Sequence, residues 1–234
     1  MRTFGRACGR AIGISLASLL FSGISEAADH QAWLKQSIDV PVFVPRNGGR
    51  IAFGAEQEEK FGKRGFIDSE TLVMIELRAC PYFALGVGDR FAYARSRGRG
   101  ELVPEHRPTL DIKLTTPEFL TLKLDSRTRL EYRMVDGKSD YMRYREMLRL
   151  TTGWSVTRWK ISPFVSEEVF FSDKPDASAA DTFDRNRAQA GLTFLPLPSL
   201  PAFVCRPYFM VQHDWDASGW EPTNVYGLDF AFKF

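Results

Sequence analysis

Apolar and polar side chains alternate over most of the second half of the chain. From Leu120 to Met134 the even positions are mainly apolar, and the odd positions are polar and nearly all charged. The same period of two returns between Tyr141 and Thr151, where arginines dominate one face. Because successive side chains of a strand point to opposite faces, both segments are predicted to be amphipathic β-strands. Glu146 interrupts the apolar face of the second one, and the pattern offers no reason for it.

Several further segments show the same alternation. Runs of about 10–14 residues exceed the usual strand of a soluble protein, and they suit a tilted crossing of a bilayer. We therefore predict strands at Phe83–Tyr93, Arg107–Leu114, Trp159–Phe171, Arg185–Phe194 and Phe203–Gln212.

The predicted connections between these strands alternate in length. Counted back from the C-terminus, Asp214–Thr223 and Ser172–Asp184 are long, whereas Pro196–Pro201 is short, and the alternation continues towards the N-terminus. Barrels of the bacterial outer membrane have long external loops and short periplasmic turns. The sequence therefore predicts an all-β fold, an antiparallel up-and-down transmembrane β-barrel formed by residues 28–234.

The strand count conflicts with this architecture. The predicted segments give eleven strands, whereas bacterial barrels have an even number and both termini in the periplasm. Either a strand before residue 70 escapes the pattern, or Gln31–Phe43 does not join the wall. We expect ten to twelve strands, with twelve as the best estimate.

The first residues predict export. Three arginines precede an apolar stretch at Ala11–Ile24, and the small residues Ser25 and Ala27 suit a cleavage site. This pattern is typical of a secretory signal peptide and too short for a spanning helix. Residues 1–27 are therefore predicted to be removed by cleavage after Ala27, and the location is predicted to be the outer membrane of a Gram-negative cell.

The last strand is the most informative segment. Tyr226, Leu228, Phe230, Phe232 and Phe234 occupy alternate positions and end on the terminal residue itself. This apolar strand edge needs a partner strand to close it. It resembles the C-terminal assembly signal that the barrel-insertion machinery recognises, so we expect that machinery to be a partner.

Four segments together resemble a known family. YMRYREMLRL, PFVSEEVFF, FDRNRAQAGLTF and NVYGLDFAFKF begin at Tyr141, Pro163, Phe183 and Asn224. They look like the domain-of-unknown-function 2490 family, outer-membrane β-barrel proteins of Gram-negative bacteria. The resemblance covers the C-terminal half well and the first hundred residues loosely. It implies location and fold, but no catalytic residue or mechanism.

Cations outnumber anions on the faces predicted to point inward. Paired charges could simply fill a narrow lumen, whereas rings of Arg and Lys would favour the passage of anions. Structural filling is the first interpretation. The cluster from Arg127 through Arg149 has few acidic neighbours in the sequence, which would leave some positive charge for a solute, so a small anion-favouring channel is the second interpretation. The predicted lumen-lining residues are Arg127, Arg129, Arg133, Arg143, Arg145, Arg149, Arg185 and Arg187.

No catalytic site is predicted. None of His30, His106 and His213 is followed by serine at the spacing that lipid hydrolases of the outer membrane use, and His213 beside Asp214 resembles an outer-membrane protease only faintly. No metal, cofactor or nucleic-acid motif occurs, and a net charge of +2 is too small to indicate nucleic acid. We expect a non-enzymatic protein; an enzyme acting on envelope lipid or peptide is an alternative.

The remaining predictions concern thiols, partners and a second alternative. Cys80 and Cys205 are expected on distant walls of the barrel and therefore unpaired. Outer-membrane lipid and lipopolysaccharide are expected partners. The basic segment Arg95–Arg99 is expected to be a solvated loop, with contact to lipopolysaccharide phosphates as the alternative. A soluble periplasmic β-sandwich that binds a ligand is the second alternative.

Overall fold

A computed structural model describes residues 30–45, 49–63, 65–95, 101–153, 157, 159–174, 183–197, 202–216 and 219–234. The predicted signal peptide and its cleavage site lie outside these residues, as does most of Arg95–Arg99. No helix in the described ranges is long and apolar enough to cross a membrane.

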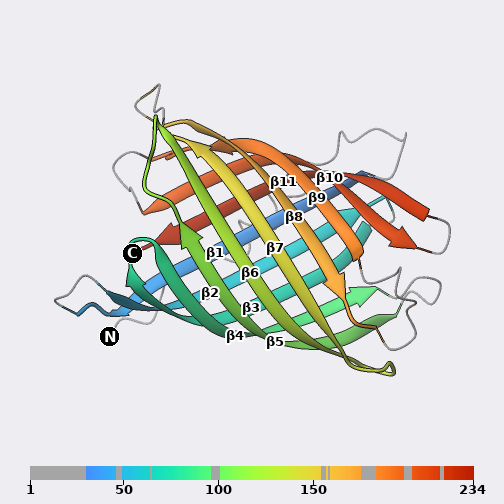
Figure 1. The fold of residues 1–234 in the computed structure, drawn as a ribbon. Coiled ribbons are helices and arrows are strands. Elements are labelled where there is room, and N and C mark those ends of the chain that lie inside the picture. The colour runs from blue at the N-terminus through green and yellow to red at the C-terminus, as the bar shows by residue number, and fades with distance from the viewer. Residues whose placement is uncertain are drawn as a thin grey trace, which may run out of the picture.

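The described residues form eleven strands that run obliquely around a closed barrel (Figure 1). Each is long and alternates between the outer and the inner face, as the period-two pattern predicts. The bounds are β1 His30–Phe43, β2 Arg50–Gly62, β3 Gly65–Cys80, β4 Phe83–Arg95, β5 Leu102–Thr115, β6 Leu122–Val135, β7 Tyr141–Thr152, β8 Ser162–Ser172, β9 Phe183–Thr193, β10 Phe203–Asp216 and β11 Gly219–Lys233.

The barrel closes through a parallel pair. Consecutive strands pair antiparallel, and β1 then pairs with β11 in parallel, with His30 opposite Asn224 and Asp39 opposite Lys233. With eleven strands the first and the last necessarily point the same way, so only a parallel ladder can join them. The best estimate of twelve strands is therefore replaced by eleven, and Gln31–Phe43 does join the wall.

The predicted alternation of loop lengths is wrong. We call the two openings the His30 end, where β1 and β11 begin, and the Phe234 end, where both finish. At the His30 end only residues 63–64 join β2 to β3, and only 217–218 join β10 to β11. Residues expected in the last long loop instead continue the ladder, with Trp215 opposite Trp220. Loop length therefore does not orient the barrel.

Two further details correct the sequence-based strands and alternatives. β8 begins at Ser162 rather than at Trp159, because Lys160 adopts a left-handed conformation with φ of 48°, which ends an extended segment. The ladder is one closed sheet, so the two-sheet sandwich is wrong. Cys80 and Cys205 are both free thiols, as predicted.

The outer wall is largely apolar. Large side chains such as Ile75, Val87 and Val165 are more than half exposed there. Glu146 also faces outward, and its carboxylate accepts hydrogen bonds from the hydroxyls of Ser126 at 2.7 Å, Thr128 at 2.5 Å and Tyr144 at 3.0 Å. Three hydroxyls thus satisfy the carboxylate that the alternation alone left unexplained.

Candidate functional site

All eight predicted arginines line the central cavity, which has a volume of about 780 Å³. They come from odd positions of β6, β7 and β9, whose inward faces the alternation identified. The expectation that few acidic groups lie near them is wrong, because seven of the eight pair with a carboxylate. Most partners come from strands other than the arginine's own, which the sequence does not juxtapose.

Arg129 and Asp111 form the most deeply buried pair. The Nε and Nη2 atoms of Arg129 donate to Oδ1 and Oδ2 of Asp111 at 2.6 and 2.7 Å. Arg129 is 1% exposed and Asp111 0% exposed. This two-point geometry is among the strongest that a guanidinium makes with a carboxylate.

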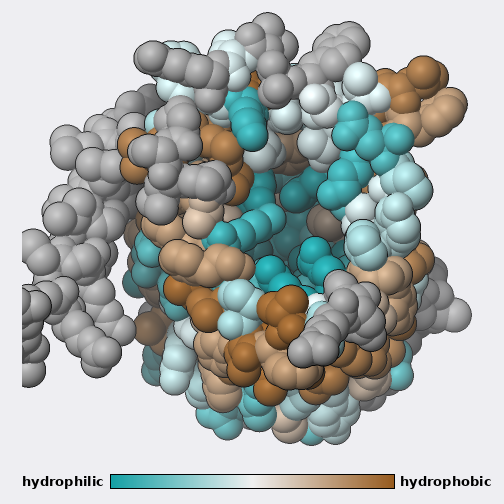
Figure 2. Space-filling view, turned by 90° about the vertical axis from the view of Figure 1, so that its left-hand side faces the viewer, coloured by the Kyte–Doolittle hydropathy of each residue, from teal (hydrophilic) through white to brown (hydrophobic). Residues whose placement is uncertain are grey.

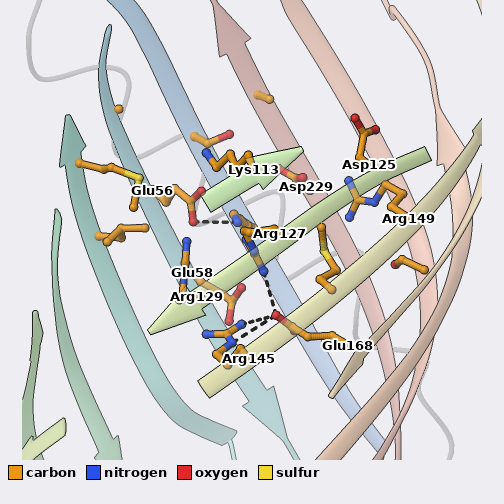
Figure 3. Close-up of a pocket in the computed structure, with 18 of the residues that line it drawn as sticks. Glu56, Glu58, Lys113, Asp125, Arg127, Arg129, Arg145, Arg149, Glu168 and Asp229 are labelled. Atoms are coloured by element: carbon orange, nitrogen blue, oxygen red, sulfur yellow. Dashed lines mark hydrogen bonds and ion pairs between the residues drawn. The ribbon is translucent and has the colours of Figure 1, made fainter. Parts of the chain in front are cut away.

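Two glutamates each hold several arginines. Glu131 accepts from Arg143 at 2.5 Å and from Arg145 at 2.7 Å. Glu168 accepts from Arg145 and from Arg127, both at 2.8 Å, so that it lies between the two guanidinium groups (Figure 3). Arg145 therefore links the two glutamates. We call this linked group, together with the separate Arg129–Asp111 pair, the paired-charge belt: Asp111, Arg127, Arg129, Glu131, Arg143, Arg145 and Glu168.

A second network lies on β2–β5, towards the His30 end. Glu70 accepts from Lys60 Nζ at 2.6 Å and also binds Arg90. Arg107 lies 3.3 Å from Glu70 and donates to Glu105 at 2.7 Å. All five side chains are buried. The network continues the pairing of the belt onto the neighbouring strands β2–β5.

One phenyl ring lies among the arginines. Phe170, from the inward face of β8, is 0% exposed, and four guanidinium carbons lie 4.7–5.5 Å from its ring centre. Cations over an aromatic face are attracted to it. The sequence analysis did not single out Phe170, although the alternation of β8 puts it on the lumen face. The four arginines are Arg143, Arg145, Arg185 and Arg187.

The Phe234 end is more open. Figure 2 looks into it and shows a hollow lined by hydrophilic residues. The side chains of Lys113 and Lys123 keep 36% and 46% of their surface accessible. We call this region the vestibule. Its cations are Arg50, Arg78, Lys113, Lys123, Arg149, Arg206 and Lys233, and its carboxylates are Asp39, Glu76, Asp125 and Asp229.

Arg149 is the exception among the eight predicted arginines. Within the described part of the chain its guanidinium forms no ion pair, and it stacks over the Phe164 ring at 4.8 Å. Asp125 is its partner in the β6–β7 register and lies beside it (Figure 3). The Asp125 carboxylate is instead engaged by Thr115 at 2.7 Å and by Lys123 at 3.4 Å.

Two glycines of the wall let aromatic rings approach the backbone closely. A Cβ at Gly227 would be 1.9 Å from the ring of Tyr208, and one at Gly191 would be 2.8 Å from Phe164. A glycine inside a strand often marks such a close approach. A side chain at either position would therefore displace the ring beside it.

The histidines do not assemble a catalytic group in the described residues. His213 lies opposite Asn186 on the outward face of β10, whereas Asp214 points inward and binds Arg185 at 2.5 Å. Neighbouring strand residues face opposite sides, so this histidine and this carboxylate cannot act together. His106 binds Asp89 on the outer wall. The described residues also contain no cluster suited to a metal ion.

The predicted C-terminal assembly residues lie apart from the lumen. Tyr226, Leu228, Phe230, Phe232 and Phe234 occupy the outward positions of the C-terminal segment, and the ring of Phe232 stacks on Phe203 at 4.8 Å. Their strand, β11, pairs with β10 on one side and with β1 on the other. Their role in assembly stays a prediction.

Comparison with known proteins agrees with this architecture. The model of the family described as "Protein of unknown function (DUF2490)" matches residues 30–221. Among solved structures, the NanC porin aligns with a TM-score of 0.51 and 10% identity, covering 89% of this chain and 100% of the porin. LpxR from Salmonella typhimurium aligns with a TM-score of 0.49 and 10% identity, covering 85% and 87%. No curated protein matches the sequence. At this identity the likeness to the porin shows a shared fold.

Proposed function

We propose that this chain, which belongs to the DUF2490 family, spans the outer membrane as a β-barrel whose lumen is filled by paired charges. The apolar outer wall and the long tilted strands support insertion into a bilayer. The porin-like fold and the outward aromatic residues of β11 support the outer membrane as its location. Outer-membrane lipid surrounds the wall, and the insertion machinery receives the C-terminal strand.

The paired-charge belt is the observation that carries this proposal. Barrels of small strand number can be filled by their own side chains, whereas larger ones leave an aqueous channel. Here seven of the eight lumen arginines are held by carboxylates, and the central pair is almost inaccessible. A solute would have to break several charge-assisted hydrogen bonds to pass. The paired side chains of the belt therefore block the lumen, and its cations are not free to bind a passing anion.

Conductance in a planar bilayer tests this closure. We expect the purified protein to show no steady conductance at high salt. The matched variant combines Glu131→Ser, Arg143→Ser and Arg145→Ser, which removes one carboxylate together with both arginines that it binds. Because little charge is left uncompensated, the variant should fold, and it should conduct.

Two outcomes would contradict the proposal. A steady, anion-selective conductance of the unchanged protein would show that the lumen is an anion channel in spite of its paired charges. Recovery of the protein from the soluble periplasm, with no heat-modifiable migration on a denaturing gel, would contradict the membrane location.

A further inference from the structure

Arg149 is a guanidinium held in place without a carboxylate. Its stacking on Phe164 at 4.8 Å fixes its orientation. Figure 3 shows the guanidinium of Arg149 in the cavity, well away from Glu58 and Arg145. A planar guanidinium on an aromatic face is pre-organised, so it loses little rotamer freedom when it binds an anion.

The nearby carboxylates are already engaged. Asp125 is bound by Thr115 and Lys123, and Asp229 accepts from Arg206 at 2.5 Å. These carboxylates and Arg206 are among the charges that act on Arg149 electrostatically. The vestibule therefore gives Arg149 no partner of its own, in contrast to the belt, where every arginine has one.

The vestibule as a whole has surplus positive charge. Its seven cations outnumber its four side-chain carboxylates, and Arg50 also donates to the main-chain oxygen of Phe234 at 3.4 Å. Carboxylates are fewer than cations, and Glu76 alone pairs with both Lys113 at 2.6 Å and Arg78 at 3.0 Å. A recess lined by one sign of charge with low-dielectric walls concentrates ions of the other sign.

We propose that the vestibule is a binding site for a multivalent anion, with Arg149 as its main contact. The hollow is open at the Phe234 end (Figure 2), and the cavity that Arg149 lines has a volume of about 780 Å³, which leaves room for a solute. A ligand with two or more negative charges, such as a diphosphate, matches the surplus better than a monovalent ion. This site does not depend on closure of the belt, which the conductance test addresses separately.

Calorimetric titration with inorganic pyrophosphate, on the full-length protein in a non-ionic detergent, tests the site. The unchanged protein should bind, and raised salt should weaken the binding. Arg149→Gln should weaken it by about tenfold or more, since a hydrogen bond to a charged group contributes roughly 1.5–3 kcal/mol. Arg149 has no ion pair to lose among the residues that the structure describes, so this variant should fold, as heat-modifiable migration on a gel can verify.

Lys138→Gln is the matched control, because it removes one positive charge from the loop after β6, at the His30 end. It should leave pyrophosphate binding unchanged. No binding by the unchanged protein would overturn the proposal. So would equal binding by Arg149→Gln, or equal weakening by Lys138→Gln, which would point to net charge alone.

Discussion

The belt and the vestibule are made of the same residue types, yet they differ in how many of their cations are paired with carboxylates. In the belt each arginine meets a carboxylate at hydrogen-bond distance, and water is excluded from Asp111 and Glu131. In the vestibule cations outnumber carboxylates, and side chains such as Lys123 remain half accessible. The difference teaches that the number of cations in a lumen does not equal the number that are free to bind an anion. What matters is how many remain unpaired and which of them a solute can reach.

Removing a belt carboxylate should have the largest effect. Asp111→Ala leaves Arg129 buried and uncompensated, and breaking such a pair costs about 3–5 kcal/mol. In the vestibule Asp125→Ala should cost only about 0–1 kcal/mol, because Lys123 is accessible to water. Urea-induced unfolding in lipid vesicles, followed by tryptophan fluorescence, measures both. Equal losses would show that the two regions do not differ in burial.

A double variant separates two costs: the loss of the Asp111–Arg129 interaction, and the burial of one charge without its partner. Combining Asp111→Leu with Arg129→Met removes both charges and keeps apolar volume. Replacing a whole buried pair in this way is often close to neutral. The double variant should therefore recover most of the stability that Asp111→Ala loses. If it remains as unstable as the single variant, the pair itself stabilises the barrel.

Alternation identified the faces but not the partners. It placed Arg127 and Arg145 in the lumen correctly, because side-chain direction follows from the strand period alone. Their shared partner Glu168 lies on β8, and the contact with Arg127 skips the intervening strand β7. Such a contact depends on register and on the curvature of the closed wall, neither of which a single sequence reveals.

The errors in the predicted fold also come from contacts between strands that a single sequence does not reveal. The parallel closure of β1 on β11 leaves no local signature, since each strand alternates as it would in an antiparallel pair. Loop lengths failed because the ladder of β10 and β11 continues through Trp215 and Trp220, which read as loop residues. Glu146 looked like an interruption because the hydroxyls that bind it, on Ser126 and Thr128, come from the neighbouring strand.

The width of the vestibule should depend on one glycine. Gly227→Ala puts a methyl group against the Tyr208 ring, which must then swing towards the lumen. Overpacking of this kind costs about 1–3 kcal/mol, and the displaced ring should also weaken pyrophosphate binding. Gly54→Ala is the control, because its nearest neighbour would be 3.8 Å away. The same urea titration measures both variants, and equal tolerance of the two would contradict the close approach.

Arg149→Gln should change stability less than the loss of any belt arginine, although it has the largest expected effect on anion binding. No carboxylate within the described residues forms an ion pair with Arg149, so the substitution leaves no buried negative charge without its partner. Phe164 is only 3% exposed, so the lost stacking is worth up to about 2 kcal/mol, and relief of repulsion from Arg206 and Arg127 offsets part of it. The free energy of unfolding should therefore fall by less than about 2 kcal/mol. Arg129→Gln in the belt should cost more, about 3–5 kcal/mol, because it leaves Asp111 buried without its two-point partner. If the two variants were equally unstable, Arg149 would be a structural member of the lumen like the others, and the contrast between belt and vestibule would fail at the residue that defines it.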